Sequence, residues 1–156
     1  MTAGPRVGAL VAELERERAA FVAALKVLPD PEGRAVVESW DGRDLVVHAA
    51  FWSEHGAEAV ELAAAGRGHE FAYDNSRTDA MNAATAAAGH ASSLAEARVR
   101  EEAAYQRFRA AVAALNEALL DLQLGNGDTV EALIRYDGPD HYAEHAEHLR
   151  YAKTAP

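Results

Sequence analysis

Apolar residues at helical spacing, interrupted by proline and glycine, place the strongest constraint on how this chain folds. In residues 7–28 and again in residues 94–122 the apolar side chains recur every three or four positions, so each segment presents one continuous apolar face. Pro29 and Pro31 end the first segment, and the Gly-Asn-Gly run at 125–127 ends the second, because neither sequence continues a helix well. The chain is 49% apolar, much of that alanine, and alternating β-branched runs are scarce. These features predict an all-α fold.

Capping signals locate the other long helices. Asp41 is a candidate N-cap, and Asp44 at the third helical position favours the positive helix end, so a second long helix is expected to run to about residue 65. Ser93 and Glu96 form a capping box before the third long helix. Pro139 suits the first turn of a terminal helix that reaches about residue 152.

Shorter elements are expected in the connections. Residues 79–89 and 128–135 are predicted to form short helices, and residues 66–78 a polar linker, long enough to cross the bundle or to form a lid. No internal repeat or low-complexity segment divides the 156 residues. We therefore expect one domain over residues 1–156, a four-helix bundle with one or two short extra helices.

Charge and composition argue against several classes of function. The 15 basic and 25 acidic residues give a net charge of −10 without a basic stripe, so nucleic acid is not an expected partner. There is no cysteine, which excludes disulfides, thiolate nucleophiles and cysteine-bound zinc. Neither a leader sequence nor a run of about 20 apolar residues is visible, so we expect a soluble, cytoplasmic protein that does not act at a membrane.

Three histidines are the candidate metal ligands. His141 and His145 lie four residues apart in the terminal helix, so both imidazoles project from one face, about one turn from each other. His48 lies on the apolar face of the second helix, where burial of an imidazole without a partner is costly. If the two helices run antiparallel, His48 and His145 each lie about 10 Å from the same end of the bundle. We therefore predict that the three hold one divalent metal ion with an open coordination position.

Other polar residues have weaker claims to the same ion. Glu144 and His148 form a rival pair at the same spacing, turned about 60° from the first pair. His148 is alternatively a proton carrier or a hydrogen-bonding partner of a ligand. His55, two turns further along the second helix, is expected to line a pocket rather than to share the ion. His69 and His90 lie in or near loops and are expected to be exposed.

Arg18 falls where the first apolar face predicts an apolar residue. Its side chain either extends past the edge of the core, which is the interpretation we favour, or points at an anionic substrate. Tyr142 is a second candidate for orienting a substrate.

Three motifs, spread over much of the chain, resemble the DinB-like superfamily. The second helix carries Asp-x-x-x-His between two tryptophans: Trp40, Asp44, His48 and Trp52. The third region begins with an acidic-x-x-Asn motif: Asp79 and Asn82. The last helix resembles the closing His-x-x-x-His-x-x-Gln-(Ile/Leu) pattern, with histidine at the glutamine position: His141, His145, His148 and Leu149.

This resemblance implies a fold and a site. The implied fold is a four-helix bundle of up-down-down-up order, often a homodimer, with a metal site at one end. Carried over by position, the metal ligands are His48, His141 and His145. The isomerase branch of the superfamily has Glu-x-x-x-His in its last helix, which keeps Glu144 and His148 open as the alternative pair.

The resemblance also implies an activity. The superfamily includes the mycothiol-dependent maleylpyruvate isomerases and the bacillithiol transferases. The chain is therefore expected to be a thiol transferase or isomerase that uses a divalent metal, zinc before nickel, and a low-molecular-weight thiol as cosubstrate on small electrophilic molecules. The related ClbS/DfsB-like proteins lack a functional metal site. A non-catalytic protein that binds a small molecule or protects against a toxin is thus the alternative, and whether the chain is an enzyme stays open.

Overall fold

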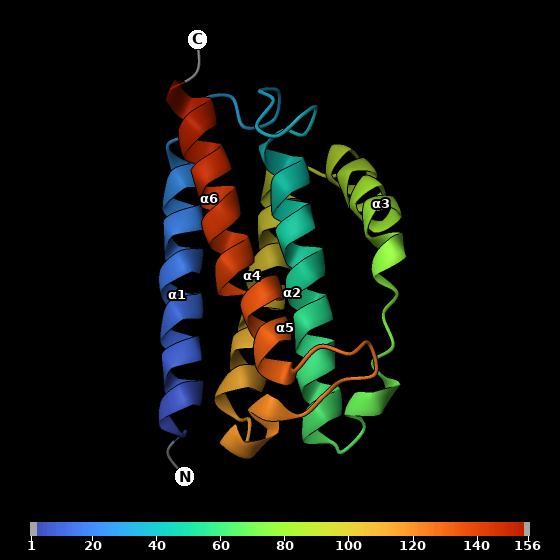
Figure 1. Ribbon diagram of the computed structural model, residues 1–156. Coiled ribbons are helices and arrows are strands. Elements are labelled where there is room, and N and C mark those ends of the chain that lie inside the picture. Colours follow the sequence, from blue (N-terminus) through green and yellow to red (C-terminus); the bar gives the residue numbers. More distant parts are fainter. Residues whose placement is uncertain (1–2, 155–156) are drawn as a thin grey trace.

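Four long helices pack side by side in the computed structural model, which describes residues 3–154 (Figure 1). They are α1 (Pro5–Lys26), α2 (Gly42–Ala64), α4 (Leu94–Ala113) and α6 (Pro139–Thr154). Two shorter helices and three 3-10 turns occupy the connections: α3 (Thr78–His90), α5 (Val130–Asp137), η1 (Gly68–Glu70), η2 (Asn75–Arg77) and η3 (Glu117–Asp121). The prediction of an all-α fold is confirmed.

The helix directions follow the up-down-down-up order. α1 and α6 run in one direction, and α2 and α4 run in the other (Figure 1). α2 packs mainly along α4, and α1 mainly along α6. Because α2 and α4 are parallel, the chain needs a long connection between them, and residues 65–93 supply it by carrying α3 back along the outside of α2. α2 and α6, which carry the candidate ligands, are antiparallel.

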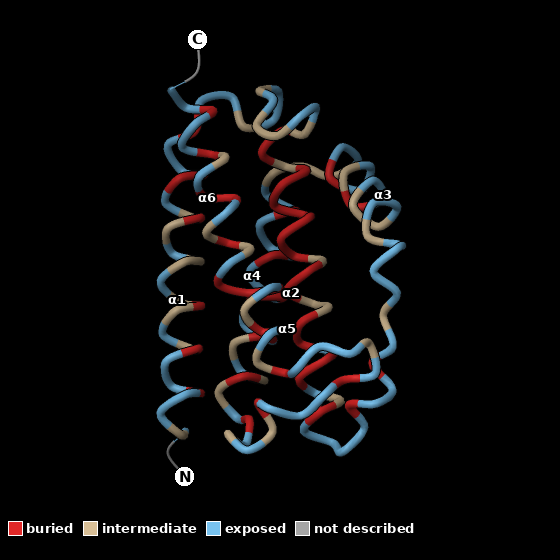
Figure 2. Tube along the Cα trace, viewed as in Figure 1, coloured by how far each residue is buried: buried red, intermediate tan, exposed pale blue. Residues whose placement is uncertain are grey.

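The predicted apolar faces meet in a common core (Figure 2). Four helices each contribute a large side chain with essentially no exposure: Leu14, Leu45, Phe108 and Tyr142. Burial of one such side chain stabilises the fold by about 1.5–3 kcal/mol. Gly56 permits the close approach of α2 to α4, because a Cβ at this position would lie 2.6 Å from the ring of Phe108.

The start of α2 is held by the predicted cap. The Asp41 carboxylate accepts the backbone N–H of Asp44 at 3.2 Å, and the Asp44 carboxylate accepts the backbone N–H of Asp41 at 3.0 Å. Asp44 is fully buried and also contacts Nδ1 of His90 at 2.7 Å, which ties the end of α3 to the start of α2. Ser93 caps α4 through the backbone N–H of Glu96, as its sequence position predicts.

The predicted third long helix, residues 94–122, is too long. α4 ends at Ala113, and the Asn116 side chain then accepts the backbone N–H of Ala118 to begin the separate turn η3. The apolar spacing continues past the end of α4 because Leu115 is buried and Leu119 packs, partly buried, against the same core. Spacing alone therefore did not distinguish a continued helix from a turn that covers the core.

The remaining boundaries differ from prediction by small amounts. α3 is one residue longer at each end than predicted, and α5 is displaced by two residues. α6 continues to Thr154, two residues beyond its predicted end. The linker 66–78 contains η1 and η2 and buries Phe71. Within residues 3–154, no helix combines the length and apolar character needed to cross a bilayer.

Candidate metal centre

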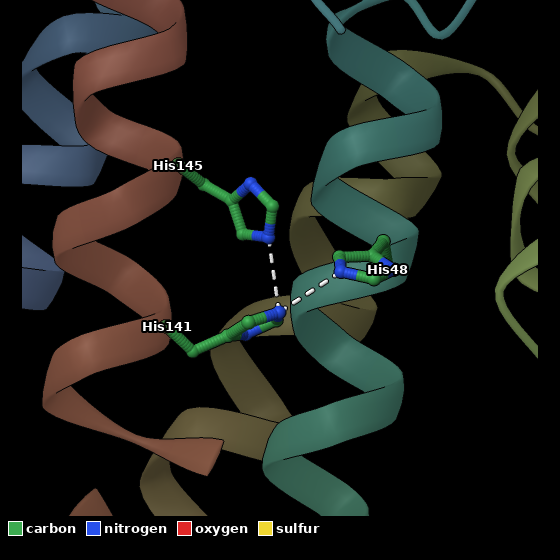
Figure 3. A group of neighbouring side chains, drawn as sticks. All are labelled: His48, His141 and His145. Carbon is green, nitrogen blue, oxygen red and sulfur yellow. Dashed lines mark hydrogen bonds between the residues drawn. The ribbon is translucent and has the colours of Figure 1, made fainter. Parts of the chain in front are cut away.

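The antiparallel packing of α2 and α6 brings the three predicted histidines together (Figure 3). His141 and His145 point from successive turns of α6 toward His48 on α2. The Nε2 atom of His141 lies 2.9 Å from Nε2 of His48 and 3.0 Å from Nε2 of His145. His48 and His145 are buried, and His141 is partly buried. His48 and His141, which are 93 positions apart in the chain, thus bring their Nε2 atoms within contact distance.

The geometry of the cluster is unusual for hydrogen bonding alone. Each imidazole nitrogen has one hydrogen-bonding direction in the ring plane, as a donor when protonated and as an acceptor when not. Nε2 of His141 faces two other Nε2 atoms, so it can complete a hydrogen bond with only one of them. A cation, by contrast, accepts the lone pairs of three imidazoles at once. The convergence therefore suits a metal ion better than a hydrogen-bonded network.

The distances are also compatible with zinc. Zinc–nitrogen bonds of about 2.0–2.1 Å in a tetrahedral site place the nitrogens about 3.3 Å apart. The two N···N distances of 2.9 and 3.0 Å are a few tenths of an ångström shorter, a difference that small side-chain rotations remove. Three protein ligands leave the fourth position of a tetrahedral ion for water or substrate.

Burial keeps the three imidazoles in the neutral form that binds metals. It lowers the pKa of His48 to about 4 and that of His145 to about 3. Burial also lowers the pKa of His141, and the neighbouring His145 and His48 lower it further. The Trp40 ring, whose centroid lies 4.8 Å from that of His48, contributes to this apolar environment. At neutral pH the cluster therefore offers lone pairs without first releasing protons.

His148 holds one ligand in the orientation that metal binding needs. Its Nδ1 lies 3.1 Å from Nδ1 of His145. When Nε2 of His145 carries the lone pair, its Nδ1 carries the proton and donates to Nδ1 of His148. The corresponding Nδ1 of His48 is buried without a hydrogen-bond partner among the residues that the structure describes. Of these two candidate ligands, His145 is the one whose second ring nitrogen has a hydrogen-bond partner.

The rival ligand pair is placed differently. Glu144 is exposed on α6 and lies outside the histidine cluster, while His148 is partly buried and contacts His145. A second group of close carboxylate and imidazole atoms is formed by Asp41, Asp44 and His90. The two carboxylates of that group already cap α2, so we assign it a structural role.

Arg18 and Tyr142, the two candidates for substrate orientation, lie in a buried polar network instead. The Arg18 guanidinium donates to both carboxylate oxygens of Glu101, at 2.8 and 3.1 Å. The Tyr142 hydroxyl donates to Glu101 at 2.6 Å and lies 3.1 Å from the hydroxyl of Ser53. Burial and the adjacent Glu101 carboxylate raise the pKa of Tyr142 well above 10. The network joins α1, α2, α4 and α6, and Arg18 also packs its guanidinium over the Tyr105 ring.

A buried pair near the cluster was not predicted. Nδ1 of His55 lies 2.7 Å from a carboxylate oxygen of Asp137, the last residue of α5. In the sequence, Asp137 precedes Gly138 and Pro139 and indicates only a helix break. The one signal that pointed to a buried pair was the position of His55 on the same face of α2 as His48. His69 and His90 are exposed, as predicted.

Comparison with known proteins identifies no relative of this chain. The sequence matches no protein-family model, and no curated protein or solved structure matches it significantly. The likeness to DinB-like proteins therefore rests on the sequence motifs.

Proposed function

We propose that this chain is a DinB-like, metal-dependent transferase or isomerase that joins a low-molecular-weight thiol of the mycothiol type to small electrophilic molecules. The observation that supports the proposal is the convergence of the Nε2 atoms of His48, His141 and His145. Zinc is the first candidate ion and nickel the second, because imidazole ligands suit both. By the same resemblance, the functional form is a homodimer in the cytoplasm.

The residues of this chain have defined roles in the proposed activity. The three imidazoles would hold the ion, which when bound lowers the pKa of a coordinated thiol or water. His148 orients His145 through the Nδ1 contact at 3.1 Å. Trp40 packs against His48 and excludes water from that side of the cluster. Because the chain has no cysteine, the thiol must come from a small cosubstrate.

Metal analysis tests the site directly. Protein purified without a histidine tag is expected to bind about one zinc or nickel ion per chain, and His48→Ala, His141→Ala and His145→Ala are each expected to remove most of it. His69→Ala is the matched control, because His69 is exposed and far from the cluster in sequence. Metal content that is the same in all four variants as in the original protein overturns the proposed site.

One observation favours the non-catalytic alternative. A groove of about 380 Å³ between α1, α2 and α4 is lined by apolar side chains, among them Phe21 and Val46, and by charged ones, among them Arg18. The three histidines are not part of this lining. A protein that only binds an apolar molecule could use such a groove. The two functions are separated by measuring thiol transfer to a general aromatic electrophile with and without a chelator. A rate that chelator abolishes and zinc restores supports the enzyme; equal rates favour the binder.

A further inference from the structure

His55 and Asp137 form a buried polar contact between α2 and the end of α5. Nδ1 of His55 and the Asp137 carboxylate are 2.7 Å apart, and their side chains are only 11% and 4% exposed. The two residues lie 82 positions apart in the sequence. Asp137 lies one turn before His141, and His55 lies two turns after His48. The pair therefore joins α2 to the end of α5, next to the place where the histidine cluster joins α2 to α6.

Aromatic side chains surround the imidazole of His55. Three aromatic rings pack on the imidazole with centroid distances of 4.6 Å for Tyr73, 4.9 Å for Phe71 and 4.9 Å for Trp52. Nε2 of His55 is buried and has no hydrogen-bond partner within residues 3–154. The aromatic rings hold the His55 imidazole in place, and its contact with the carboxylate in turn holds Asp137 in place.

Asp137 lies at a break between two stacked helices. Backbone bonds from Gly138 to Ile134 and from Tyr142 to Gly138, at 2.9 and 3.0 Å, continue the helical path on either side. Between them Pro139 has no N–H to donate, and Gly138 departs from helical geometry with φ −109° and ψ −105°. A helix interrupted in this way bends more readily than a continuous one.

The position of this break matters for the histidine cluster. His141 follows Asp137 by four residues, or about 6 Å along a helix. A change of about 10° at the break would move His141 by about 1 Å at that distance. Metal coordination tolerates deviations of only about 0.2 Å. The angle between α5 and α6 must therefore be fixed if His141 is to share an ion with His48.

We infer that the His55–Asp137 pair is a positioning device for the metal site: it clamps the α5–α6 break to α2 and so sets the distance from His141 to His48. This inference rests on the proposed metal-binding function. It assigns His55 and Asp137 no contact with the ion or the substrate. Their effect is expected in the affinity and geometry of the site rather than in its ligand set.

The experiment compares Co²⁺ and Zn²⁺ binding among variants of the full chain. His55→Phe keeps a ring among the aromatic residues and removes the polar contact, whereas Asp137→Leu removes it from the other side. Each is expected to weaken zinc binding about 10- to 100-fold and to shift the visible absorption bands of bound Co²⁺. His55→Asn is expected to restore affinity to within about threefold, because its amide N–H can occupy the position of Nδ1.

The control is Val60→Ala, which removes buried apolar volume from α2 without touching the pair. It is expected to lower stability while leaving zinc affinity and the Co²⁺ bands unchanged. If His55→Phe does not fold, Asp137→Leu decides the question. Original protein that binds no metal overturns the proposed function and this inference together. Original protein that binds metal, with both pair-breaking variants binding equally tightly, overturns the inference alone.

Discussion

A hydrogen bond to the second nitrogen of a neutral imidazole fixes both its tautomer and the orientation of its ring. His145 has such a partner in His148, whereas Nδ1 of His48 is buried without one in the described part of the chain. The two candidate ligands are therefore held by different means: His145 by a hydrogen bond and His48 by packing, chiefly against Trp40. The consequence is that His148 should influence metal binding although it is not one of the ligands.

His148→Ala is expected to weaken zinc binding about 10- to 100-fold, because His145 loses the acceptor that fixes its tautomer and ring orientation. Competition with a chromophoric chelator measures the affinity. The matched control is His90→Ala, which removes an imidazole bonded to Asp44 rather than to a ligand. Equal affinities for His148→Ala and the original protein would remove His148 from the site.

The buried histidines also predict how stability depends on pH in the metal-free protein. The pKa values of His48 and His145 fall to about 4 and about 3 on folding, from about 6.5 in the unfolded chain. Below pH 6.5 the unfolded state therefore binds more protons than the folded state, and the free energy of unfolding decreases as the pH falls. His48 and His145 together account for up to about 4 kcal/mol between pH 7 and pH 5. His141, whose pKa is also lowered, adds to this loss.

Urea denaturation at both pH values, in the presence of a chelator, measures this loss. His145→Gln removes one of the three groups and is expected to show a smaller decrease than the original protein. The raised pKa of Asp137 acts in the opposite direction but is common to both proteins, so it cancels in the comparison. A variant with the same pH dependence as the original protein contradicts the assignment of the effect to the cluster.

Among the elements, α3 is the helix most weakly joined to the bundle. Only Thr85 and Gly89 of its thirteen residues are buried, and most of its surface faces solvent (Figure 2). Its contacts to α2 include the hydrogen bond from the Trp52 indole to Asn82 and the contact of His90 with Asp44. Elements with few buried contacts open at low free energy, so α3 is the region where local opening is expected.

Gly89→Ala tests this attachment. A Cβ at this position would lie 2.5 Å from the Cα of Asp44, so the end of α3 must move away from α2. We expect faster amide hydrogen exchange over residues 78–90, with little change in α2 or α6. Gly8→Ala is the control: no atom lies within 4 Å of its Cβ position, and it is expected to stabilise α1 by about 1 kcal/mol through helix propensity. Unchanged exchange in α3 would contradict the close approach.

Much of this arrangement was predictable from the sequence, and the exceptions have physical reasons. Apolar spacing and caps located the helices because those signals are local, and helix spacing alone paired His141 with His145. The end of α4 was missed because Leu115 and Leu119 continue the spacing and pack against the core after the helix stops. The contact of His55 with Asp137 was missed because it depends on how two distant helices are rotated against each other, which no local pattern records.

At the scale of the whole molecule, one buried network joins all four long helices. Arg18 of α1 and Tyr142 of α6 both donate to Glu101 of α4, and Tyr142 also contacts Ser53 of α2. The Glu101 side chain is only 4% exposed, so its charge depends on these donors. Removing Glu101 leaves the buried Tyr142 hydroxyl without this acceptor and leaves the Arg18 guanidinium with only the more exposed Glu102 as an ion-pair partner.

Glu101→Ala is therefore expected to lower the free energy of unfolding by about 3 kcal/mol. Glu54→Ala breaks a bidentate ion pair with Arg100 between α2 and α4 that is partly exposed, and is expected to change stability by less than about 1 kcal/mol. Urea denaturation of both variants at pH 7 measures the difference. Similar losses in the two variants would mean that the network contributes no more than a surface pair.

The histidine cluster joins positions 93 residues apart, one in the second helix and one in the last. An ion bound there would act as a reversible cross-link. A covalent cross-link that closes a loop of that length lowers the conformational entropy of the unfolded chain and so stabilises the folded state by about 4–5 kcal/mol. Loss of the ion would release that constraint and expose the chain to proteases. The supply of metal, rather than any change in the protein itself, would then determine how long each molecule survives.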